Sequence, residues 1–399
     1  FIIIYRIFKK KENPKRFLEK FSLLKKNRDK GKLIWFHCSS VGEFLSIVPL
    51  ILEFEKMAII KSILVTTSTL SSSKIFEKFK FKKTIHQFYP VDHFLLTNNF
   101  LNHWKPSLAI FIESEIWPYM FKNLKDKKIP LILLNARITK KTFNRWSKIN
   151  FFSKLIFGMI TVAYPQNLET KYFLKKIKTK KINRIGNLKF AENPEENFTI
   201  KNKKLKSELN KNKIWVASST HKNEEIFCAN AHKELKKKNK NLITIIIPRH
   251  VHRANEIALE MKKINLNVAY HSSKIQTLKN IDIYIVDTFG ETKLFHKISS
   301  TVFIGGSIIK RGGQNPLEAA RLGSKILHGP NTDNFKDVYK HLKLLNISKK
   351  INTPLQLASS IVFKKNKNSG KKIKKIGQKI LNKTINELDN LINNEFKKT

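Results

Sequence analysis

Residues 302–318 read VFIGGSIIKRGGQNPLE, and this stretch decides the fold. Its opening run, Val302 to Ile304, is β-branched and aromatic and predicts a buried strand. Two Gly-Gly pairs flanking Arg311 predict a loop, and Asn315 to Glu318 have the cap, proline and acidic residue typical of a helix start, with the helix continuing to Leu322. Capping alone explains a helix after a strand. The glycine pairs go further and favour a loop that an anion approaches closely.

Short apolar runs of strand length recur before and after this stretch, with helical segments between them. They cover residues 33–38, 62–67, 85–89, 108–112, 131–134, 214–217, 242–247, 268–270, 281–286, 302–304 and 325–327. Such alternation indicates βαβ units and an α/β fold with parallel sheets covered on both faces. The pattern restarts after a polar, proline-containing stretch at 191–198, so we expect two doubly wound, Rossmann-like domains facing each other across a cleft.

The pattern also predicts boundaries. The expected parts are an N-terminal segment 1–30, a first domain 31–190, a linker 191–212, a second domain 213–375 and a helical tail 376–399. Ligands of doubly wound sheets bind just beyond the carboxyl ends of the strands. The residues after each strand are therefore the candidates for chemistry.

Composition limits the class of protein. The chain has 399 residues and a formal net charge of +48, which would attract nucleic acid, anionic lipid or a phosphorylated substrate. A compositional drift spread over the whole surface is the competing explanation, since the chain is rich in Lys, Asn and Ile throughout. Its two cysteines, Cys38 and Cys228, form neither a disulfide framework nor a metal-binding pair, which favours a reducing compartment.

The N-terminal run Phe1 to Phe8 is apolar and is followed at once by three lysines. It is shorter than the ~20 apolar residues that span a bilayer. Because the chain begins with Phe, we expect the numbering to start inside a longer gene product. The run is then either the cytoplasmic end of a membrane anchor or a strand of the core.

Acidic residues follow two strands of the first domain. Glu43 lies three residues after Ser40, which is capping-box spacing, but Gly42 beside it leaves room for a substrate, so Glu43 is also a candidate general base. Glu113 and Glu115 follow the strand at 108–112 and are either turn residues or a polar cluster that orients a substrate. A cation, Arg137, follows the next strand, and Lys189 lies beside the linker.

The second domain carries residues suited to an anion. Ser219-Thr220-His221, Pro248-Arg249-His250 and Asp287 to Glu291 each follow a strand. No Gly-x-Gly-x-x-Gly follows the first strand and no P-loop is present, which argues against dinucleotide oxidoreductases and P-loop NTPases. The histidines at 250 and 252 lack a partner at zinc spacing, so no metal is expected.

Taken in order, these segments resemble the 3-deoxy-D-manno-octulosonic acid (Kdo) transferases of lipopolysaccharide assembly. The matching residues are Ser40 to Glu43, Glu113 to Pro118, Asn135 to Arg137, Gln166-Asn167, Gly186 to Phe190, Ser219 to His221, Pro248 to His250, Asp287 to Glu291, Gly305 to Ser307 and Gly312 to Glu318. They extend from about residue 34 to 337. Any one of them is weak evidence, but the ordered set is specific.

The resemblance implies a metal-independent, cofactor-free GT-B glycosyltransferase that inverts the anomeric centre as it moves Kdo from CMP-Kdo to a lipid A precursor (lipid IVA). Carried over by position, Glu43 is the general base, and Glu113 and Lys189 stabilise the transition state. The implied CMP-binding residues are Pro248, Arg249, Phe289, Gly290, Glu291, Asn315, Pro316, Leu317 and Glu318.

The resemblance also implies a place in the cell, the cytoplasmic face of the inner membrane. An anionic membrane surface would attract the basic chain. We expect Phe1 to Phe21 and the apolar helix after Glu43 to face that membrane.

Some residues depart from the family pattern. Gln314 stands where the family usually has His, Tyr164-Pro165 precede Gln166, and Asn223-Glu224 replace the more usual Gly-Glu. Two alternatives remain open: another GT-B nucleotide-sugar transferase or a sugar epimerase, and, more remotely, a basic nucleic-acid-binding protein. The second leaves the carboxylates at Glu43, Glu113 and Glu115 unexplained, and no nucleic-acid partner is expected.

Overall fold

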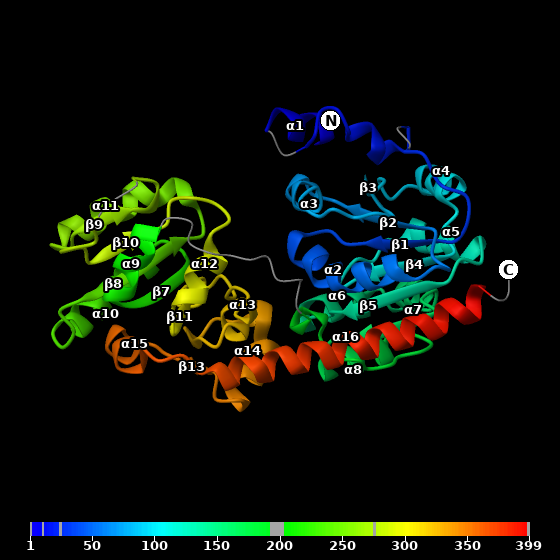
Figure 1. Ribbon diagram of the computed structural model, residues 1–399. Coiled ribbons are helices and arrows are strands. Elements are labelled where there is room, and N and C mark those ends of the chain that lie inside the picture. Colours follow the sequence, from blue (N-terminus) through cyan, green and yellow to red (C-terminus); the bar gives the residue numbers. More distant parts are fainter. Residues whose placement is uncertain (1, 10–11, 24–25, 192–202, 274–276, 397–399) are drawn as a thin grey trace. The chain divides into compact units, whose positions relative to one another are not determined.

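The computed structural model describes residues 2–9, 12–23, 26–191, 203–273 and 277–396 (Figure 1). The chain divides into two compact units. Unit 1 is Phe1–Pro194 together with Ile376–Thr399, and unit 2 is Glu195–Lys375.

Unit 1 is built on a six-stranded sheet whose strands are all parallel, in the order β3-β2-β1-β4-β5-β6. The strands are β1 (Leu33–His37), β2 (Ser62–Thr67), β3 (Thr84–Phe88), β4 (Leu108–Ile112), β5 (Leu131–Ala136) and β6 (Val162–Pro165). The helices between them are α2 (Val41–Lys56), α3 (Leu70–Phe76), α4 (Phe94–Trp104), α5 (Pro118–Asp126), α6 (Lys140–Lys148), α7 (Asn150–Phe157) and α8 (Leu168–Lys176). The strand order reverses direction at β1 and β4, which makes their carboxyl ends the switch point of the sheet.

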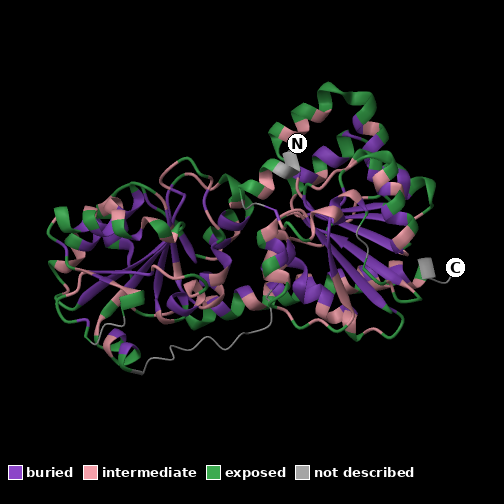
Figure 2. Ribbon diagram, turned by 90° about the horizontal axis from the view of Figure 1, so that it is seen from above, coloured by how far each residue is buried: buried purple, intermediate pink, exposed green. Residues whose placement is uncertain are grey.

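Successive residues of each strand supply opposite faces of this sheet. In β1, Ile34 and Phe36 pack in one core cluster while Leu33 and Trp35 pack in the other. Figure 2 shows the central strands of both units as buried, and β1, β2, β4 and β5 of unit 1 are buried at every position, as are β8, β10 and β11 of unit 2. Burial on both faces explains why the strands read as continuous apolar runs in the sequence.

The helix after Glu43 belongs to this core. Its apolar residues, including Phe44, Ile47 and Phe54, are fully buried and pack against strand residues such as Ile34. The prediction that this helix faces a membrane is therefore wrong, because its apolar side already covers the sheet.

Unit 2 contains a seven-stranded parallel sheet in the order β13-β12-β11-β7-β8-β10-β9. The strands are β7 (Lys213–Thr220), β8 (Leu242–Pro248), β9 (Val268–Tyr270), β10 (Ile283–Ile285), β11 (Thr301–Ile304), β12 (Lys325–His328) and β13 (Ser348–Lys350). The helices are α9 (Lys203–Lys211), α10 (Glu224–Lys236), α11 (Ala254–Lys263), α12 (Thr292–Ile298), α13 (Leu317–Arg321), α14 (Lys336–Leu344) and α15 (Pro354–Ser360). Here the order reverses at β7 and β11, so the fold class predicted from the sequence, two doubly wound α/β sheets, is confirmed.

A few elements differ from the predictions. Strands β6 and β13 were not expected, because β6 ends in Pro165 and β13, which reads Ser-Lys-Lys, contains no apolar run. Residues 192–202 of the predicted linker lie outside the described residues, and residues 203–211 form α9, in which Leu205 and Leu209 are buried. The last helix, α16 (Lys367–Phe396), begins in unit 2, and its later residues Leu381, Leu388 and Ile392 complete a core cluster of unit 1.

The N-terminal run forms a helix, α1 (Ile2–Phe8), so the alternative that it is a core strand is wrong. Within the described part of the chain, the helices lack the combination of length and apolar character that a bilayer span requires. Tyr5 and Phe8 of α1 are exposed.

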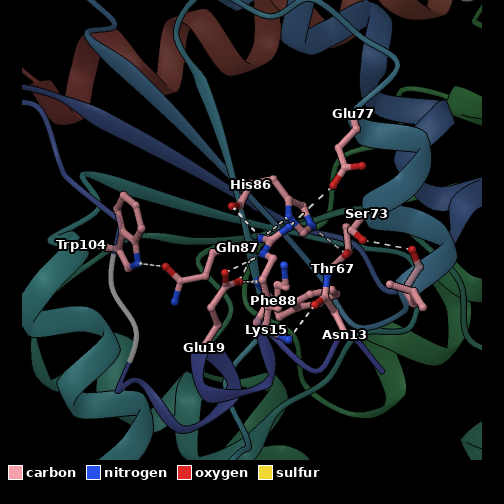
Figure 3. A network of polar contacts seen from close by, with 12 residues as sticks. Asn13, Lys15, Glu19, Thr67, Ser73, Glu77, His86, Gln87, Phe88 and Trp104 are labelled. Carbon is pink, nitrogen blue, oxygen red and sulfur yellow. Dashed lines mark hydrogen bonds and ion pairs between the residues drawn. The ribbon is translucent and has the colours of Figure 1, made fainter. Parts of the chain in front are cut away.

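The segment after α1 is held on the sheet edge by a buried polar network (Figure 3). The Glu19 carboxylate accepts a hydrogen bond from Arg16 Nε at 2.7 Å and another from the backbone N–H of Phe88, in the edge strand β3, at 2.8 Å. Lys20 Nζ donates to both carboxylate oxygens of Glu12 at 2.8 Å. These contacts cover the open edge of β3 and make the segment part of unit 1.

Candidate active site

The switch point of unit 1 carries three carboxylates. Glu43 lies in the first turn of α2, directly after β1, while Glu113 and Glu115 follow β4. Strands β1 and β4 are neighbouring parallel strands, so the residues beyond their carboxyl ends share one edge of the sheet. The structure therefore brings together acidic residues that are about 70 positions apart in the sequence.

Glu43 is fixed by the turn that starts its helix. Its carboxylate accepts hydrogen bonds from the backbone N–H of Ser39 at 2.7 Å and from the Ser40 hydroxyl at 2.9 Å. The Ser40 hydroxyl in turn accepts from the backbone N–H of Glu43 at 3.4 Å, which completes the predicted cap. A Cβ added to Gly42, the residue before Glu43, would meet no atom within 4 Å, so the space at Gly42 is open.

The surroundings of Glu43 make it a stronger base than an ordinary glutamate. Burial raises the pKa of Glu43 to about 7, and the negative charges of Glu113 and Glu115 act in the same direction. The bonds from Ser39 and Ser40 oppose the rise only in part. A carboxylate with a pKa near neutrality can both accept a proton and release it again at physiological pH.

Glu113 forms an ion pair with Lys189, the residue predicted to share its role in stabilising the transition state. Lys189 Nζ lies 2.6 Å from Glu113 Oε1, and both side chains are largely buried. Asn135, at the end of β5, reaches the same oxygen at 3.5 Å and accepts from the backbone N–H of Leu188 at 3.0 Å. Asn135 thus links the two segments that carry the pair.

The backbone is strained at two residues of this site, Glu113 and Asn135. Glu113 has φ +58° and Asn135 has φ +52°, a region that residues other than glycine seldom occupy. Such conformations persist where the surrounding structure enforces them and often mark functional sites.

Glu115 makes contacts that sequence reasoning missed. Its Oε2 lies 3.1 Å from His37 Nε2 and accepts from Trp117 Nε1 at 2.9 Å. The other ring nitrogen of His37 lies 3.0 Å from the Thr66 hydroxyl. Burial lowers the pKa of His37 despite the Glu115 carboxylate, which leaves a neutral ring that orients Glu115. His37 carried no signal in the sequence, because it lies inside an apolar strand.

Unit 2 gathers cations at the ends of β7 and β8. His221 and His250 have ring centroids 5.9 Å apart, and Arg249 follows Pro248 at the end of β8 with its side chain exposed. Burial lowers the pKa of His221, and the charges of His250, Arg311 and Arg249 act in the same direction. The buried Nε2 atom of His221 has no hydrogen-bond partner among the described residues. The exposed guanidinium groups of Arg249 and Arg311 are well suited to a phosphorylated ligand.

Gly306 lies at the centre of this group. A Cβ added to Gly306 would stand 3.4 Å from His221 Cδ2, 3.5 Å from Arg311 Cβ and 3.5 Å from Gln314 Nε2. The glycine, which has φ +66°, therefore allows three polar side chains from separate segments to converge. Gln314, the departure from the family pattern, belongs to the group.

The first part of the glycine-rich loop, residues 306–308, binds a carboxylate of the chain itself. The Glu224 carboxylate, fully buried, accepts from the backbone N–H groups of Gly306 at 2.6 Å, Ser307 at 2.9 Å and Ile308 at 2.9 Å. It also accepts from the N–H of His221 at 3.0 Å. The anion that these three amides bind is therefore the chain's own carboxylate, and the close approach of an anionic ligand stays a prediction for the second glycine pair, Gly312-Gly313.

Gly305 is required for packing rather than for ligand access. A Cβ there would lie 2.4 Å from the carbonyl oxygen of Ser219, so only glycine lets β11 end against β7. Glu224 and Gly305 together hold the loop at the end of β11 against the end of β7. In the sequence, Asn223-Glu224 were noted only as replacing the more usual Gly-Glu, and Glu224 was given no role.

The other predicted ligand segments lie near α12 and α13. Phe289 is 82% exposed, Gly290 has φ +91°, and Glu291 Oε2 lies 2.7 Å from His271 Nε2. Helix α13 begins one residue later than predicted, with Pro316 before its first turn and the Asn315 side chain accepting from the N–H of Leu317 at 3.0 Å. The side chains of Pro316 and Leu317 are buried, so at this segment Asn315 and Glu318 are the side chains open to a ligand.

Among the described residues, His, Cys, Asp and Glu side chains form no group of three placed to hold a metal ion. Cys38 and Cys228 are free thiols, buried in units 1 and 2 respectively.

Comparison of the sequence with known proteins identifies a family. Residues 15–192 match the family described as 3-deoxy-D-manno-octulosonic-acid transferase (kdotransferase). A 3-deoxy-D-manno-octulosonic acid transferase of Rickettsia bellii is 33% identical over 380 residues, which cover 94% of this chain and 89% of that protein. The transferase of Haemophilus influenzae is 30% identical over 77% of this chain and 73% of its own. A probable mitochondrial transferase of Arabidopsis thaliana is 32% identical over 88% and 81%.

Solved structures agree on the fold. A glycosyltransferase from Rickettsia africae superposes with a TM-score of 0.56 at 12% identity over 93% of this chain and all of that chain. A putative UDP-N-acetylglucosamine 2-epimerase from Listeria monocytogenes gives a TM-score of 0.59 at 14% identity over 92% and 98%. At these identities the likeness concerns the GT-B-like fold alone. The identity to the transferases over most of both sequences shows that this chain belongs to the 3-deoxy-D-manno-octulosonic acid transferase family of glycosyltransferases.

Proposed function

We propose that the protein transfers Kdo from CMP-Kdo to a lipid A precursor, lipid IVA, with inversion at the anomeric carbon and without a metal ion. The observation that carries the proposal is Glu43, an anchored carboxylate that follows the open space at Gly42 and has a pKa raised to about 7. It is the kind of group that removes a proton from a sugar hydroxyl. The identity of the transferred sugar, Kdo, is inferred from the family to which the chain belongs.

In the proposed step, Glu43 takes the proton of an acceptor hydroxyl while the hydroxyl oxygen attacks the anomeric carbon of Kdo. The bond from that carbon to the phosphate oxygen breaks, and CMP leaves with the electron pair. Attack opposite the leaving group inverts the anomeric centre. Glu43 ends the step protonated and returns the proton to water.

The transition state of such a reaction is charged in two places: positive on the sugar ring and negative on the departing phosphate. Glu113 and Lys189, whose charged atoms lie 2.6 Å apart, offer one fixed charge of each sign. We assign transition-state stabilisation to this pair. Asn135 maintains it by holding the segment before Lys189.

We assign CMP binding to unit 2. Arg249, which follows Pro248 at the end of β8 and is exposed, would contact the phosphate. Phe289 to Glu291 and Asn315 to Glu318 would contact the remaining part of the nucleotide. The exposed ring of Phe289 is available to pack on a base or ribose.

The proposed acceptor lies in a membrane, so we place the protein on the cytoplasmic face of the inner membrane. The large positive charge of the chain supports contact with an anionic membrane surface.

The test is a transfer assay that combines purified protein, CMP-Kdo generated in situ and tetra-acylated lipid A precursor in detergent, followed by mass spectrometry of the lipid. A gain of one or more Kdo masses supports the proposal and counts the additions. Competition by CMP but not by UDP is expected for binding. Absence of any Kdo gain from folded protein, or competition by UDP, would assign the fold to another nucleotide sugar.

A further inference from the structure

The strongest unexplained surface of unit 1 lies on α6 and α7, two short helices joined at Ile149. Four large apolar side chains are exposed there: Ile149 (50%), Phe151 (75%), Phe152 (58%) and Leu155 (46%). The rings of the two phenylalanines touch each other, with centroids 5.7 Å apart. A cluster of exposed apolar side chains on a folded unit marks an interaction site more often than a defect of packing.

This cluster is not left over from a poorly packed core. The opposite side of α7 is well packed, because Ser153, Ile156 and Phe157 are buried. The half-buried Phe143 and Trp146 of α6 pack against the core as well. Both helices are thus firmly seated, and their outer face is presented to the surroundings.

Positive charge surrounds the exposed side chains. Five cations lie on the two helices: Lys140, Lys141, Arg145, Lys148 and Lys154. None of them forms an ion pair with another residue in the described part of the chain. The sequence from residue 127 to 168 contains eight Lys and Arg residues and no Asp or Glu. The cations therefore remain available to an external partner.

We propose that α6 and α7 form the surface by which the protein docks on a bilayer of anionic lipid, with Phe151 and Phe152 entering the interface and the cations contacting headgroups. An aromatic and aliphatic face bordered by Lys and Arg is what interfacial helices present to such bilayers. A second copy of the chain is a poor occupant, since a formal net charge of +48 on each copy makes them repel. The inference rests on the proposed function, which places the acceptor in a membrane.

The position of the surface in the fold suits an acceptor lipid. Helix α6 begins four residues after β5 ends, and the connecting loop carries Arg137, whose N–H donates to the carbonyl oxygen of Glu113 at 3.2 Å. Helix α6 therefore begins at the edge of the unit 1 sheet at which the carboxylate site lies.

The experiment is flotation of the full chain with vesicles of phosphatidylcholine alone or mixed with phosphatidylglycerol. We expect flotation with the mixed vesicles only, and a loss of it at high salt. The double variant Phe151→Ser/Phe152→Ser should reduce partitioning at least about tenfold, because each exposed ring contributes on entering the interface. Arg145→Glu/Lys148→Glu should reduce it by a similar factor.

Matched controls are Leu344→Ser/Leu355→Ser and Lys340→Glu/Lys343→Glu, which change exposed residues of unit 2. Both controls should float like the wild type, and all variants should melt at the wild-type temperature. Equal flotation of the α7 variant and the wild type would overturn the proposal. So would flotation that charge reversal abolishes but the serine substitutions leave intact, which is the behaviour of a purely electrostatic partner such as nucleic acid.

A parallel transfer assay separates this inference from the proposed function. The Phe151→Ser/Phe152→Ser variant should keep wild-type transfer to acceptor in detergent and lose at least about tenfold with acceptor in anionic vesicles, in proportion to its lost binding. Equal transfer by both proteins in vesicles would count against the docking surface. Failure of the wild type in detergent would instead reject the proposed function, and flotation would still decide the docking surface.

Discussion

Each unit places a glutamate in the first turn of the helix after its first strand, and the two carboxylates meet opposite surroundings. Glu224 in unit 2 is fully buried and accepts four backbone N–H groups. Glu43 in unit 1 accepts one backbone N–H and one hydroxyl and has two further carboxylates nearby. Burial alone therefore does not decide what a carboxylate does. The donors and charges around it make Glu224 a structural anchor and Glu43 a titrating base.

The sharpest test of this contrast is Glu43→Gln. This change removes the base but keeps a side-chain oxygen that can accept the hydrogen bond from the Ser39 N–H. We expect transfer to fall by about 10²–10⁴-fold, the usual contribution of a general base, while CMP binding is unchanged. Initial rates and calorimetric CMP titration measure the two effects. Glu53→Gln, on an exposed residue of the same helix that pairs with Lys56, is the control. Full activity of Glu43→Gln would remove the residue from the role of base.

Glu224→Gln should produce the reverse result. The side-chain amide presents an N–H to amides that need an acceptor, so we expect unfolding to become easier by about 2–4 kcal/mol and CMP to bind at least about tenfold more weakly. Thermal melting and calorimetry give both values. Glu234→Gln, which is exposed on the same helix, should change neither. An unaltered CMP affinity would show that the glycine loop does not depend on Glu224.

The pH dependence of transfer follows from the Glu43 pKa. With that pKa raised to about 7, Glu43 is mostly protonated at pH 6 and mostly ionised at pH 8. The base must be ionised, so we expect the rate at saturating substrate to rise about tenfold between these values and then to level off. A profile that stays flat from pH 6 to pH 8 would contradict the elevated pKa.

Stability should respond in the opposite direction. The folded state raises the Glu43 pKa from the ordinary 4.5 to about 7, so it holds this proton more tightly than the unfolded chain does. The contribution of Glu43 to stability therefore falls as pH rises between these two values. Glu43→Gln should be more stable than wild type by about 1–2 kcal/mol at pH 8, with the difference nearly absent at pH 4.5. Denaturant unfolding at the two pH values measures it; a constant difference would point to a cause other than titration.

The smallest effect is expected at Gln314, which lies with His221 and Arg311 around Gly306. Gln and His both offer a hydrogen bond, so Gln314→His should change CMP affinity by about threefold or less, roughly the energy of a weak hydrogen bond. Calorimetry at pH 6 and pH 8 checks this, because the new ring adds a titrating group. A loss of more than about tenfold would show that the amide makes a contact that imidazole cannot replace.

Local pattern was enough to predict much of the fold. Continuous apolar runs identified β1, β2, β4 and β8 closely, since burial on both faces leaves little choice of residue. The pattern failed at β6, which ends in a proline, and at β13, whose residues are polar. The pattern was also misinterpreted at α2, because an apolar helix has the same residue pattern whether a sheet or a membrane covers it.

The sequence by itself determined the alternation of strands and helices, the residues that follow each strand and, through their order, the family. Only the tertiary structure decided which of those residues work together. The bond from Lys189 to Glu113 and the clamp from Glu224 to the glycine loop join residues 76 to 84 positions apart. Local sequence carries no record of such pairs, because their partners are set by the order of strands in the sheet. The pKa of Glu43 likewise depends on burial and on Glu113 and Glu115, which are distant in sequence, so the spacing of residues along the chain could not predict it.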